Sequence, residues 1–400
     1  MAAGDTCNVA SGTYDERVTI NTPGNSGAPI TYAASGKVIM KGFTINASYI
    51  TIRGFEITNT DADWTDGPGI IVTSGNNCLI ENNYVYEATY KGIVTSSSTS
   101  SCTIKNNRLY RNGMVGVEVA GNNNTVEGNE IWGTIQHHPK WPNPPGADAD
   151  GIRFFGSGHV IRNNHIHDIT YNDPENVDPH IDCFQTWGDS WNQAGSDIVF
   201  EKNLCVALES HATRENGHGF MLQGASGLVI RNNIIRTFGG INTGGGECSN
   251  LTIINNLFAS DPTFPVDRSP IGIGLFDAPN CTIKNNIFYN QPSHIIYVTG
   301  SSGTGLDVGY NLMYRSDGKS LWGSPYPHDL WGVNPKFVAA GSDFHLASDS
   351  PCIDAGAGLS MVTNDFDGNS RPEGNAYDIG PYEQRLVSKP TSPKNLRVLP

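Results

Sequence analysis

The segments CLIENNYVY (78–86), CTIKNNRLY (102–110), HVIRNNHIH (159–167) and CTIKNNIFY (281–289) are copies of one pattern. Each copy contains an aliphatic residue, two mostly polar residues, an asparagine, a variable residue and another aliphatic residue. ITIRGFEIT (50–58) is an earlier copy with Gly54 in the asparagine place. Self-similarity of this kind indicates a repeat architecture. The recurring asparagines are Asn83, Asn107, Asn129, Asn164, Asn203, Asn233, Asn256, Asn286 and Asn311.

A second motif, glycine-apolar-any-apolar, lies between these copies, as in GIIVT, GVEVA, GIRFF and GFMLQ. Alternation with a period of two over short runs indicates strands that bury one face. An asparagine at a fixed place fits a tight left-handed turn, with the side-chain amides stacked from one repeat to the next. Two or three short strands per repeat, closed by Asn and Gly corners, predict a parallel β-helix.

Composition excludes several classes of protein. Only 16% of the chain is charged, which argues against long amphipathic helices. The net charge of -14 leaves no basic patch for nucleic acid. It does not exclude an anionic glycan, because Ca²⁺ can bridge carboxylates. We find no apolar run that could span a bilayer. The opening MAAGDTCNV has no signal-peptide pattern, and we interpret the chain as a mature domain with an added start Met.

The eight cysteines form no Cys-x-x-Cys pair, so a zinc site of that kind is not expected. Cys78, Cys102 and Cys281 occupy a column that holds Leu or Ile in other copies, and Cys205 replaces an aliphatic residue in another column. We therefore predict buried thiols that fill the core. The alternative is a bridge between Cys78 and Cys102 in neighbouring rungs.

AGDTCNVASGTYDERVTI (3–20) and GNSGAPITYAA (24–34) resemble the entrance strands of secreted β-helix proteins of the pectate-lyase superfamily, which includes the family 9 lyases. DFHLASDSPCIDAG (343–356) and DFDGNSRPEGNAYDIGPYE (365–383) resemble their closing segment. The resemblance implies an all-β chain, a single-stranded right-handed parallel β-helix with long loops on one side. It also implies a secreted, extracellular protein that acts as a monomer on a polysaccharide.

We expect the β-helix to be a catalytic domain over residues 1–387. The tail SKPTSPKNLRVLP (388–400) reads as a Pro/Ser linker towards a fibronectin-type-III-like module that is not part of this sequence.

The spacing of the repeats locates a candidate site. Four of the eight steps between the recurring asparagines are 22 to 25 residues long, but the three consecutive steps from Asn129 to Asn164, Asn203 and Asn233 are 35, 39 and 30 residues. The step from Asn256 to Asn286 is also 30 residues. Adjacent insertions on a solenoid project from one side and form the walls of a groove. We therefore expect the substrate to bind beside these three long rungs.

The strand entrances DGIRF, DCFQT and HGFML align across rungs and place Asp150, Asp182 and His218 in one column. Lys91 and Val115 hold that place in the two preceding rungs. Neighbouring parallel strands are about 4.8 Å apart, so these side chains are predicted to lie within reach of one sugar. If Ile152, Phe184 and Phe220 point inward, the outward residues are Glu118, Arg153, Gln185 and Met221.

Aromatic side chains of the insertions suit a sugar chain, because they can stack on the apolar faces of pyranose rings. We expect an extended groove with polar side chains beside the tryptophans. The predicted substrate-binding residues are Lys91, Glu118, Gln185, Trp141, Trp187, Trp191 and Arg214.

Cleavage of a uronate-containing glycan by β-elimination needs three groups: one that neutralises the carboxylate, a base for the C5 proton and an acid for the leaving oxygen. Arg153, Gln185 or a Ca²⁺ ion could be the first, and His180, His218 or Lys91 the base. A loop tyrosine such as Tyr171, or a histidine, could be the acid. The predicted catalytic residues are His180, Asp182, Asp150, Arg153 and His218. The predicted ligands of the Ca²⁺ ion are Asp148, Asp150, Asp178 and Asp182.

ADADGIRFF is similar to the calcium-binding motif of the family 9 lyases at Asp148, Asp150 and Gly151. Phenylalanines follow where that family has a lysine base, which favours a histidine base here. The segment Asp178-Pro179-His180 resembles the Asp-Pro-His motif of mannuronan C5-epimerases, with Ile181 inserted before the next acidic residue.

The favoured function is a polysaccharide lyase acting on an anionic, uronate-containing glycan. A glycoside hydrolase with Asp150 and Asp182 as acid and base is the second hypothesis, because carboxylates in adjacent rungs would lie about 5 Å apart. A uronan C5-epimerase shares proton abstraction at C5 with the lyase. A non-catalytic carbohydrate-binding β-helix is the remaining alternative.

Overall fold

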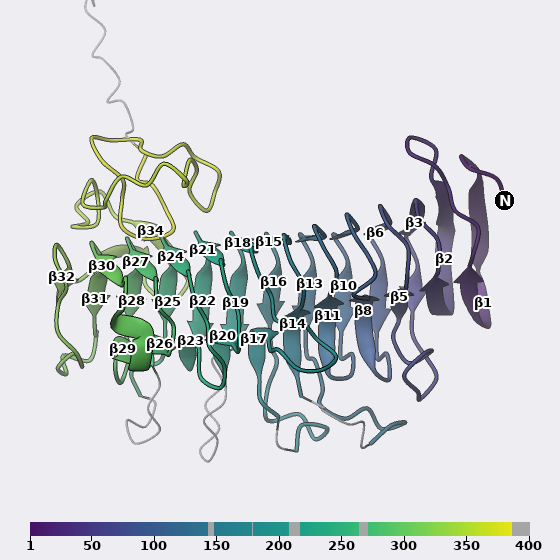
Figure 1. Cartoon of the computed structure of the whole chain (residues 1–400), viewed down its shortest axis with the longest axis horizontal. Helices are drawn as coiled ribbons and strands as arrows, with labels where there is room; N and C mark the ends of the chain where they lie inside the picture. Colours follow the sequence, from purple (N-terminus) through teal and green to yellow (C-terminus); the bar gives the residue numbers. More distant parts are fainter. Residues whose placement is uncertain (143–147, 178, 208–216, 264–270, 386–400) are drawn as a thin grey trace, which may run out of the picture.

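The computed structural model describes residues 1–142, 148–177, 179–207, 217–263 and 271–385. In this part of the chain, one continuous sheet of 32 strands coils along the long axis of the molecule. The pairings within that sheet are parallel and join each strand to the equivalent strand of the next rung (Figure 1). The predicted all-β parallel β-helix is therefore confirmed.

Each rung contributes up to three short strands, which stack into three faces. The first face consists of β3 (Ile50–Arg53), β6 (Leu79–Glu81), β9 (Thr103–Lys105), β12 (Thr125–Glu127), β15 (Val160–Arg162), β18 (Val199–Glu201), β21 (Val229–Arg231), β24 (Thr252–Ile254), β27 (Thr282–Lys284) and β30 (Asp307–Gly309). The second face consists of β4 (Glu56–Ile57), β7 (Tyr84–Tyr86), β10 (Arg108–Tyr110), β13 (Glu130–Trp132), β16 (His165–His167), β19 (Leu204–Ala207), β22 (Ile234–Thr237), β25 (Leu257–Ala259), β28 (Ile287–Tyr289), β31 (Leu312–Tyr314) and β32 (Leu330–Trp331).

The third face carries the strands that follow the long insertions. It consists of β5 (Ile70–Val72), β8 (Lys91–Thr95), β11 (Val115–Val119), β14 (Asp150–Phe154), β17 (Asp182–Thr186), β20 (His218–Leu222), β23 (Gly239–Asn242), β26 (Ile273–Phe276) and β29 (Ile296–Thr299), which a short 3₁₀ helix (Gly300–Gly303) follows. The long loops of the third face extend from β14 and β17 on the lower side of Figure 1.

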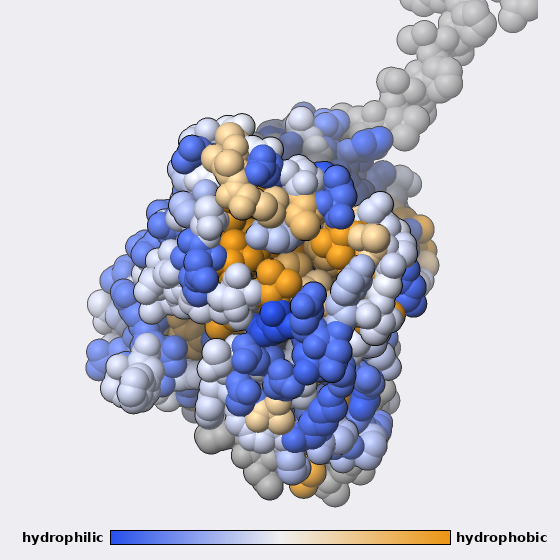
Figure 2. All heavy atoms as spheres, turned by 90° about the vertical axis from the view of Figure 1, so that its right-hand side faces the viewer, coloured by the Kyte–Doolittle hydropathy of each residue, from blue (hydrophilic) through white to orange (hydrophobic). Residues whose placement is uncertain are grey.

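The two long strands β1 (Thr6–Ile20) and β2 (Ile30–Ile45) begin the coil. β2 pairs in turn with β3, β4 and β5. It therefore bends around the corners and pairs with the first strand of each of the three faces. Figure 2 looks onto this end of the molecule and shows apolar residues gathered in the middle with hydrophilic residues around them. Val9, Tyr14 and Val18 of β1 are partly buried against the core.

The predicted asparagine ladder forms, but the left-handed turn and the ladder hydrogen bond belong to two neighbouring residues, whereas we expected one asparagine to provide both. The residue before each ladder asparagine adopts the left-handed turn, for example Asn82 and Asn163 at φ 56° and 54°. The ladder asparagine itself is buried and donates its amide to the next one, as from Asn164 to Asn203 at 3.0 Å. Gly54 is therefore a turn residue, and Phe55 holds the first ladder place, donating its backbone N–H to Asn83.

The interior is filled by inward side chains from all three faces, and the five-residue strands of the third face contribute two each, as Ile152 and Phe154 of β14 do. On the third face Ile152, Phe184 and Phe220 are fully buried, and the rings of Phe184 and Phe220 stack with centroids 4.6 Å apart. The core is continuous along the coil, which fixes the inward register and, by alternation, the outward one.

The prediction for the cysteines is partly wrong, because Cys183 and Cys205 form a disulfide. The second residue of most third-face strands is glycine: a Cβ on Gly151 would lie 2.8 Å from the Ile166 side chain of the second face. In β17 Cys183 takes the place of this glycine, and in β19 Cys205 takes the place of this isoleucine. The two Sγ atoms therefore meet. Cys78 and Cys102 are buried free thiols.

After β32 the chain leaves the stack and folds back along its outside, above β21 to β27 in Figure 1. This segment contains the antiparallel pair β33 (Phe337–Ala339) and β34 (Asp343–Leu346). Asn255 donates to the carbonyl of Asp378 and ties the segment to the coil. The predicted linker 388–400 lies outside the described residues. No helix in the described ranges has the length and apolar character needed to cross a membrane.

Candidate active site

The register of the third face places the predicted column as expected. Asp182 pairs with His218, Val115 pairs with Asp150, and Lys91 pairs with Val115. The column therefore runs Lys91, Val115, Asp150, Asp182 and His218 over five successive rungs. Two aspartates and a histidine follow one another in its last three places.

The neighbouring outward column is also confirmed. Glu118 pairs with Arg153, Arg153 with Gln185, and Gln185 with Met221. Arg153 therefore lies between the acidic residues of the first column and Glu118 of the preceding rung. The two columns lie side by side on the third face and bring Arg153 next to Asp150.

A chain of hydrogen bonds links four of these residues. Arg153 Nε donates to Asp150 Oδ2 at 2.7 Å, and Asp150 Oδ1 accepts the backbone N–H of Asp182 at 3.1 Å. Asp182 Oδ1 lies 3.1 Å from Nδ1 of His218. A carboxylate that accepts from Nδ1–H fixes the imidazole tautomer with Nε2 free as an acceptor. The arrangement can hold a histidine base in a defined orientation.

Burial divides this chain into covered and accessible members. The side chains of Asp150 and Asp182 are 0% and 1% exposed, whereas His218 is 21% exposed. We expected an open groove wall here, but every residue of β14 and β17 is buried. Trp187, from the segment after β17, lies over the guanidinium of Arg153 at 5.3 Å. Direct contact between a sugar and Asp150 or Asp182 is therefore not supported, and the same burial covers Arg153 and Gln185.

Burial also changes the proton affinities in this cluster. It raises the pKa of Asp150 well above its usual value, although Arg153 acts in the opposite direction. It raises the pKa of Asp148 in the same way. For Arg153, burial acts to lower the pKa, but the carboxylates of Asp150, Glu118 and Asp148 outweigh it and the pKa is raised. Arg153 therefore remains the cation of the cluster.

His180 lies at the surface beside this cluster. Its side chain is 65% exposed, and its Nδ1 is 3.7 Å from Asp148 Oδ2. Its backbone N–H donates to Asp148 Oδ1 at 2.7 Å. His180 is thus held near the buried acids through Asp148 while its ring stays accessible to solvent.

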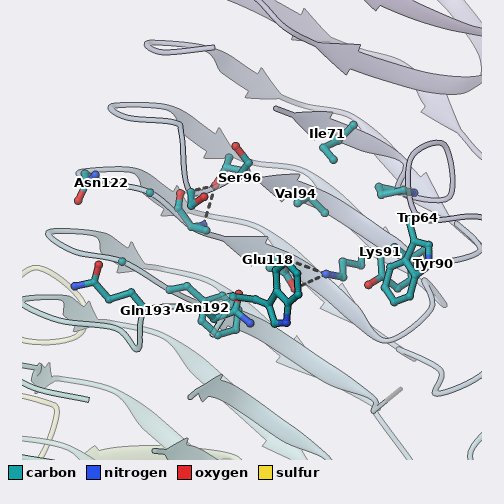
Figure 3. Close-up of a pocket in the computed structure, with 18 residues that line it drawn as sticks. Trp64, Ile71, Tyr90, Lys91, Val94, Ser96, Glu118, Asn122, Asn192 and Gln193 are labelled. Carbon is teal, nitrogen blue, oxygen red and sulfur yellow. Dashed lines mark hydrogen bonds and ion pairs between the residues drawn. The ribbon is translucent and has the colours of Figure 1, made fainter. Parts of the chain in front are cut away.

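A pocket of about 320 Å³ opens on the same face, over the rungs that precede the buried cluster (Figure 3). Ile71, Val94 and Glu118, which are successive members of the outward column, line it. The volume is within the range of sites that bind small molecules or single sugars. The accessible part of the third face is therefore displaced by one to three rungs from the predicted position.

Lys91 and Glu118 form an ion pair in this pocket, with Lys91 Nζ 2.7 and 2.6 Å from the two carboxylate oxygens of Glu118 (Figure 3). Burial lowers the pKa of Lys91, although Glu118 opposes the effect. Both residues were predicted to bind substrate, and both line the pocket.

The three predicted tryptophans have different surroundings. Trp191 is 89% exposed and lines the pocket beside Asn192 and Gln193. Trp141 packs on Trp64, with ring centroids 5.3 Å apart. Trp187 instead covers Arg153 and packs on Phe155 at 4.7 Å, so it belongs to the cover of the charged cluster.

Sequence reasoning missed Trp64 and Tyr90, which stand together at one side of the pocket with centroids 4.8 Å apart (Figure 3). Lys91 Nζ lies 4.6 Å from the centre of the Tyr90 ring. A signal for Trp64 was present: 28 residues separate Phe55 from Asn83, so this rung also carries an insertion.

The described aspartates do not fit the predicted calcium site. Arg153 supplies the positive charge beside Asp150 and Asp148, and Asp182 is engaged by His218. A cation such as Ca²⁺ would have to displace a guanidinium from its carboxylate. Asp178, the fourth predicted ligand, and Arg214, a predicted substrate-binding residue, lie outside the described residues.

Solved structures with a similar fold include several that act on or bind carbohydrates. Pectate lyase Pel9A is 16% identical, with a TM-score of 0.51 over 96% of this chain and 89% of that chain. XylC in complex with xylose is 12% identical, with a TM-score of 0.63 over 96% and 93%. The PL6 family alginate lyase AlyGC is 14% identical, with a TM-score of 0.52 over 81% and 51%. At these identities the likeness concerns the fold.

No curated protein sequence matches the chain significantly. The sequence model of the family described as the right handed beta helix region matches residues 41–176 and 190–324, more than half of the chain. These two segments contain the strands of the third face from β5 to β29 apart from β17, and the ladder asparagines from Asn83 to Asn311. The chain therefore belongs to the right-handed β-helix family.

Proposed function

We propose that the protein is a secreted, monomeric carbohydrate-active enzyme that cleaves a uronate-containing polysaccharide by β-elimination. The observation that carries the proposal is the His218–Asp182 pair, which presents an oriented imidazole on the same face as a pocket with aromatic walls. The disulfide between Cys183 and Cys205 supports an oxidising, extracellular location.

In this mechanism His218 Nε2 removes the proton from C5 of a uronate sugar, and Asp182 stabilises the imidazolium through Nδ1. The electron pair of the C–H bond forms the C4–C5 double bond, and the bond from C4 to the glycosidic oxygen breaks. The exposed His180 is the proposed acid that protonates the leaving oxygen. One new chain end carries an unsaturated uronate.

Asp150 and Arg153 are proposed as positioning residues rather than catalytic ones. Asp150 holds the backbone of Asp182 in place, and Arg153 neutralises Asp150 from the other side. The buried charged residues thus fix the position of Asp182 and, through Asp182, the orientation of the accessible His218 imidazole. Preorganisation of this kind keeps the base within the narrow range of positions that proton transfer requires.

The distance between the pocket and the base favours a polymer over a small sugar. Lys91 and His218 are four rungs apart in one column, which corresponds to roughly 19 Å. The ammonium of Lys91 is suited to the carboxylate of a second uronate in the same chain, and the rings of Trp64, Tyr90 and Trp191 to its pyranose faces. An extended anionic chain along the third face would engage both sites.

The hydrolase hypothesis is less well supported, because its two carboxylates, Asp150 and Asp182, are covered. The epimerase alternative uses the same base and differs only in returning a proton to C5. The non-catalytic alternative would use the pocket alone.

The test is an assay of the purified protein on pectate, alginate and xylan. We expect ultraviolet absorbance from unsaturated product to grow with at least one uronate polymer and not with xylan. New reducing ends without that absorbance would support the hydrolase, and a change in the ratio of C5 epimers without cleavage would support the epimerase. Binding with none of these would leave a carbohydrate-binding protein and refute the proposal.

A further inference from the structure

A second cluster of functional side chains lies on the second face, which carries none of the residues of the candidate active site. Glu130 of β13 pairs with His165 of β16, and His167 follows two residues later on the same strand. Because side chains two residues apart in a strand leave the same side, both imidazoles point outward with Glu130. Ile131 and Ile166, which alternate with them, are buried in the core.

The three side chains converge. One ligand atom from each lies within 4.8 Å of the others, and in the described part of the chain this is the one such group of three or more His, Cys, Asp or Glu residues. His167 Nε2 is 3.5 Å from Glu130 Oε1. That nitrogen is buried and makes no hydrogen bond within the described residues. A buried imidazole nitrogen that faces a carboxylate oxygen and another imidazole is suited to a metal ion.

The outer atoms of the same residues are already engaged. His167 Nδ1 lies 2.7 Å from Asp168 Oδ2, and Glu130 Oε2 accepts from Arg108 Nε at 3.0 Å. These contacts leave His167 Nε2 and Glu130 Oε1 directed at the centre of the group. A carboxylate behind a metal-binding histidine is the usual way in which proteins fix the ring and its tautomer. Trp132 stacks parallel to the His167 ring, with centroids 5.9 Å apart.

We propose that Glu130, His165 and His167 form a site for a divalent transition metal of the Zn²⁺ type. Two imidazoles and one carboxylate are typical ligands of this ion, whereas Ca²⁺ prefers oxygen ligands alone. Tetrahedral ligands of Zn²⁺ are about 3.4 Å apart, so the side chains must close by roughly 1 Å. The fourth position is left for water. The ion would clip β13 to β16 and so join two neighbouring rungs from outside.

The experiment uses the full chain after treatment with a chelator and removal of the chelator. Zn²⁺ is titrated by calorimetry, and Co²⁺ is titrated by visible absorption as a spectroscopic substitute. We expect one equivalent of each to bind, a tetrahedral Co²⁺ spectrum without a thiolate charge-transfer band, and a higher thermal midpoint with Zn²⁺. A thiolate band would assign the metal to a cysteine such as the partly exposed Cys7 and refute the proposal.

Variants locate the site. His167→Gln and Glu130→Gln are each expected to weaken Zn²⁺ binding by at least about tenfold, and Asp168→Asn by about ten- to a hundredfold through the outer contact. The control is His328→Asn, which removes an exposed imidazole elsewhere at a left-handed position (φ 64°) that asparagine tolerates. It should bind as the parent does. Parent-like binding by both His167→Gln and Glu130→Gln, with unchanged metal-free thermal midpoints, would overturn the proposal, as would no binding by the parent.

Discussion

Two columns of polar residues run along this β-helix, and they are built on opposite principles. In the asparagine ladder every member is the same, and each carboxamide donates to the next at 3.0 to 3.1 Å, from Asn83 to Asn311. In the charged column of the third face, Lys91, Val115, Asp150, Asp182 and His218 are nearly all different.

The difference shows how a repetitive fold acquires a site. A carboxamide has both a donor and an acceptor, so identical residues satisfy one another when they are stacked and buried. Identical acids or bases would repel. In the charged column each of the two adjacent acids instead has its own partner, Arg153 for Asp150 and His218 for Asp182. We expect the ladder to contribute to stability and the charged column to contribute to both activity and stability.

The largest expected effect concerns the base. His218→Ala should lower kcat by about 10²- to 10⁴-fold, because proton abstraction at C5 loses its acceptor. Initial rates of unsaturated product formation measure this loss. The thermal midpoint should fall, because the buried carboxylate of Asp182 loses its partner, so the rates are compared at a temperature at which both proteins are folded. His328→Asn is the control and should retain full activity, and substantial turnover by His218→Ala would remove the base assignment.

The next effect tests the ladder. Asn164→Ala should destabilise the protein by at least about 2 kcal/mol, because the Asn129 amide and the Val126 carbonyl lose their partners in a buried setting. Urea unfolding measures the change. The neighbouring Asn163→Gly, which alters only the left-handed turn residue, should change stability by no more than about 1 kcal/mol. Equal losses from the two substitutions would contradict the division of roles between them.

A smaller effect is expected in the pocket. Lys91→Met removes the cation and leaves Glu118 to repel a uronate, so KM for an anionic polymer should rise about tenfold or more, as for a lost charged hydrogen bond. The value of kcat should change little, because Lys91 is four rungs from His218. Lys105→Met is the matched control, because it breaks the ion pair with Glu81 on the first face. A fall in kcat with unchanged KM would place Lys91 in the chemical step instead.

The smallest effect is expected from a chelator. Arg153, rather than a metal ion, neutralises the buried aspartates, so EDTA should change the cleavage rate by less than about twofold. Rates before and after dialysis against EDTA, with and without added Ca²⁺, provide the measurement. A loss of activity that Ca²⁺ restores would show that the charged column depends on a metal after all.

Much of the geometry could be predicted from the sequence, because residues at equivalent places in successive rungs of a β-helix lie next to each other. Once the strand entrances DGIRF, DCFQT and HGFML are aligned, the register of β14, β17 and β20 follows, and with it the column from Asp150 to His218. The Cys183–Cys205 pair could also have been predicted, because Cys183 stands where neighbouring rungs have glycine and Cys205 stands where they have isoleucine.

What could not be predicted depends on the insertions, which do not repeat. Whether a long loop walls a groove or closes over it depends on contacts such as that of Trp187 with Arg153, which no alignment of rungs contains. For the same reason the open pocket was placed one to three rungs too far along the helix. Trp64 was not predicted because its insertion lies before the three long rungs from which the site was predicted.

The Cys183–Cys205 bond has a mechanical consequence. In a β-helix the backbone hydrogen bonds run roughly parallel to the axis, so the walls of one rung are joined by the turns of the chain and by side-chain packing. This covalent link crosses the tube between β17 and β19, directly beside Asp182, and acts as a transverse brace. Breathing of the walls at that level would shift Asp182 against His218, so the brace keeps the alignment of the proton-transfer pair independent of fluctuations in the tube.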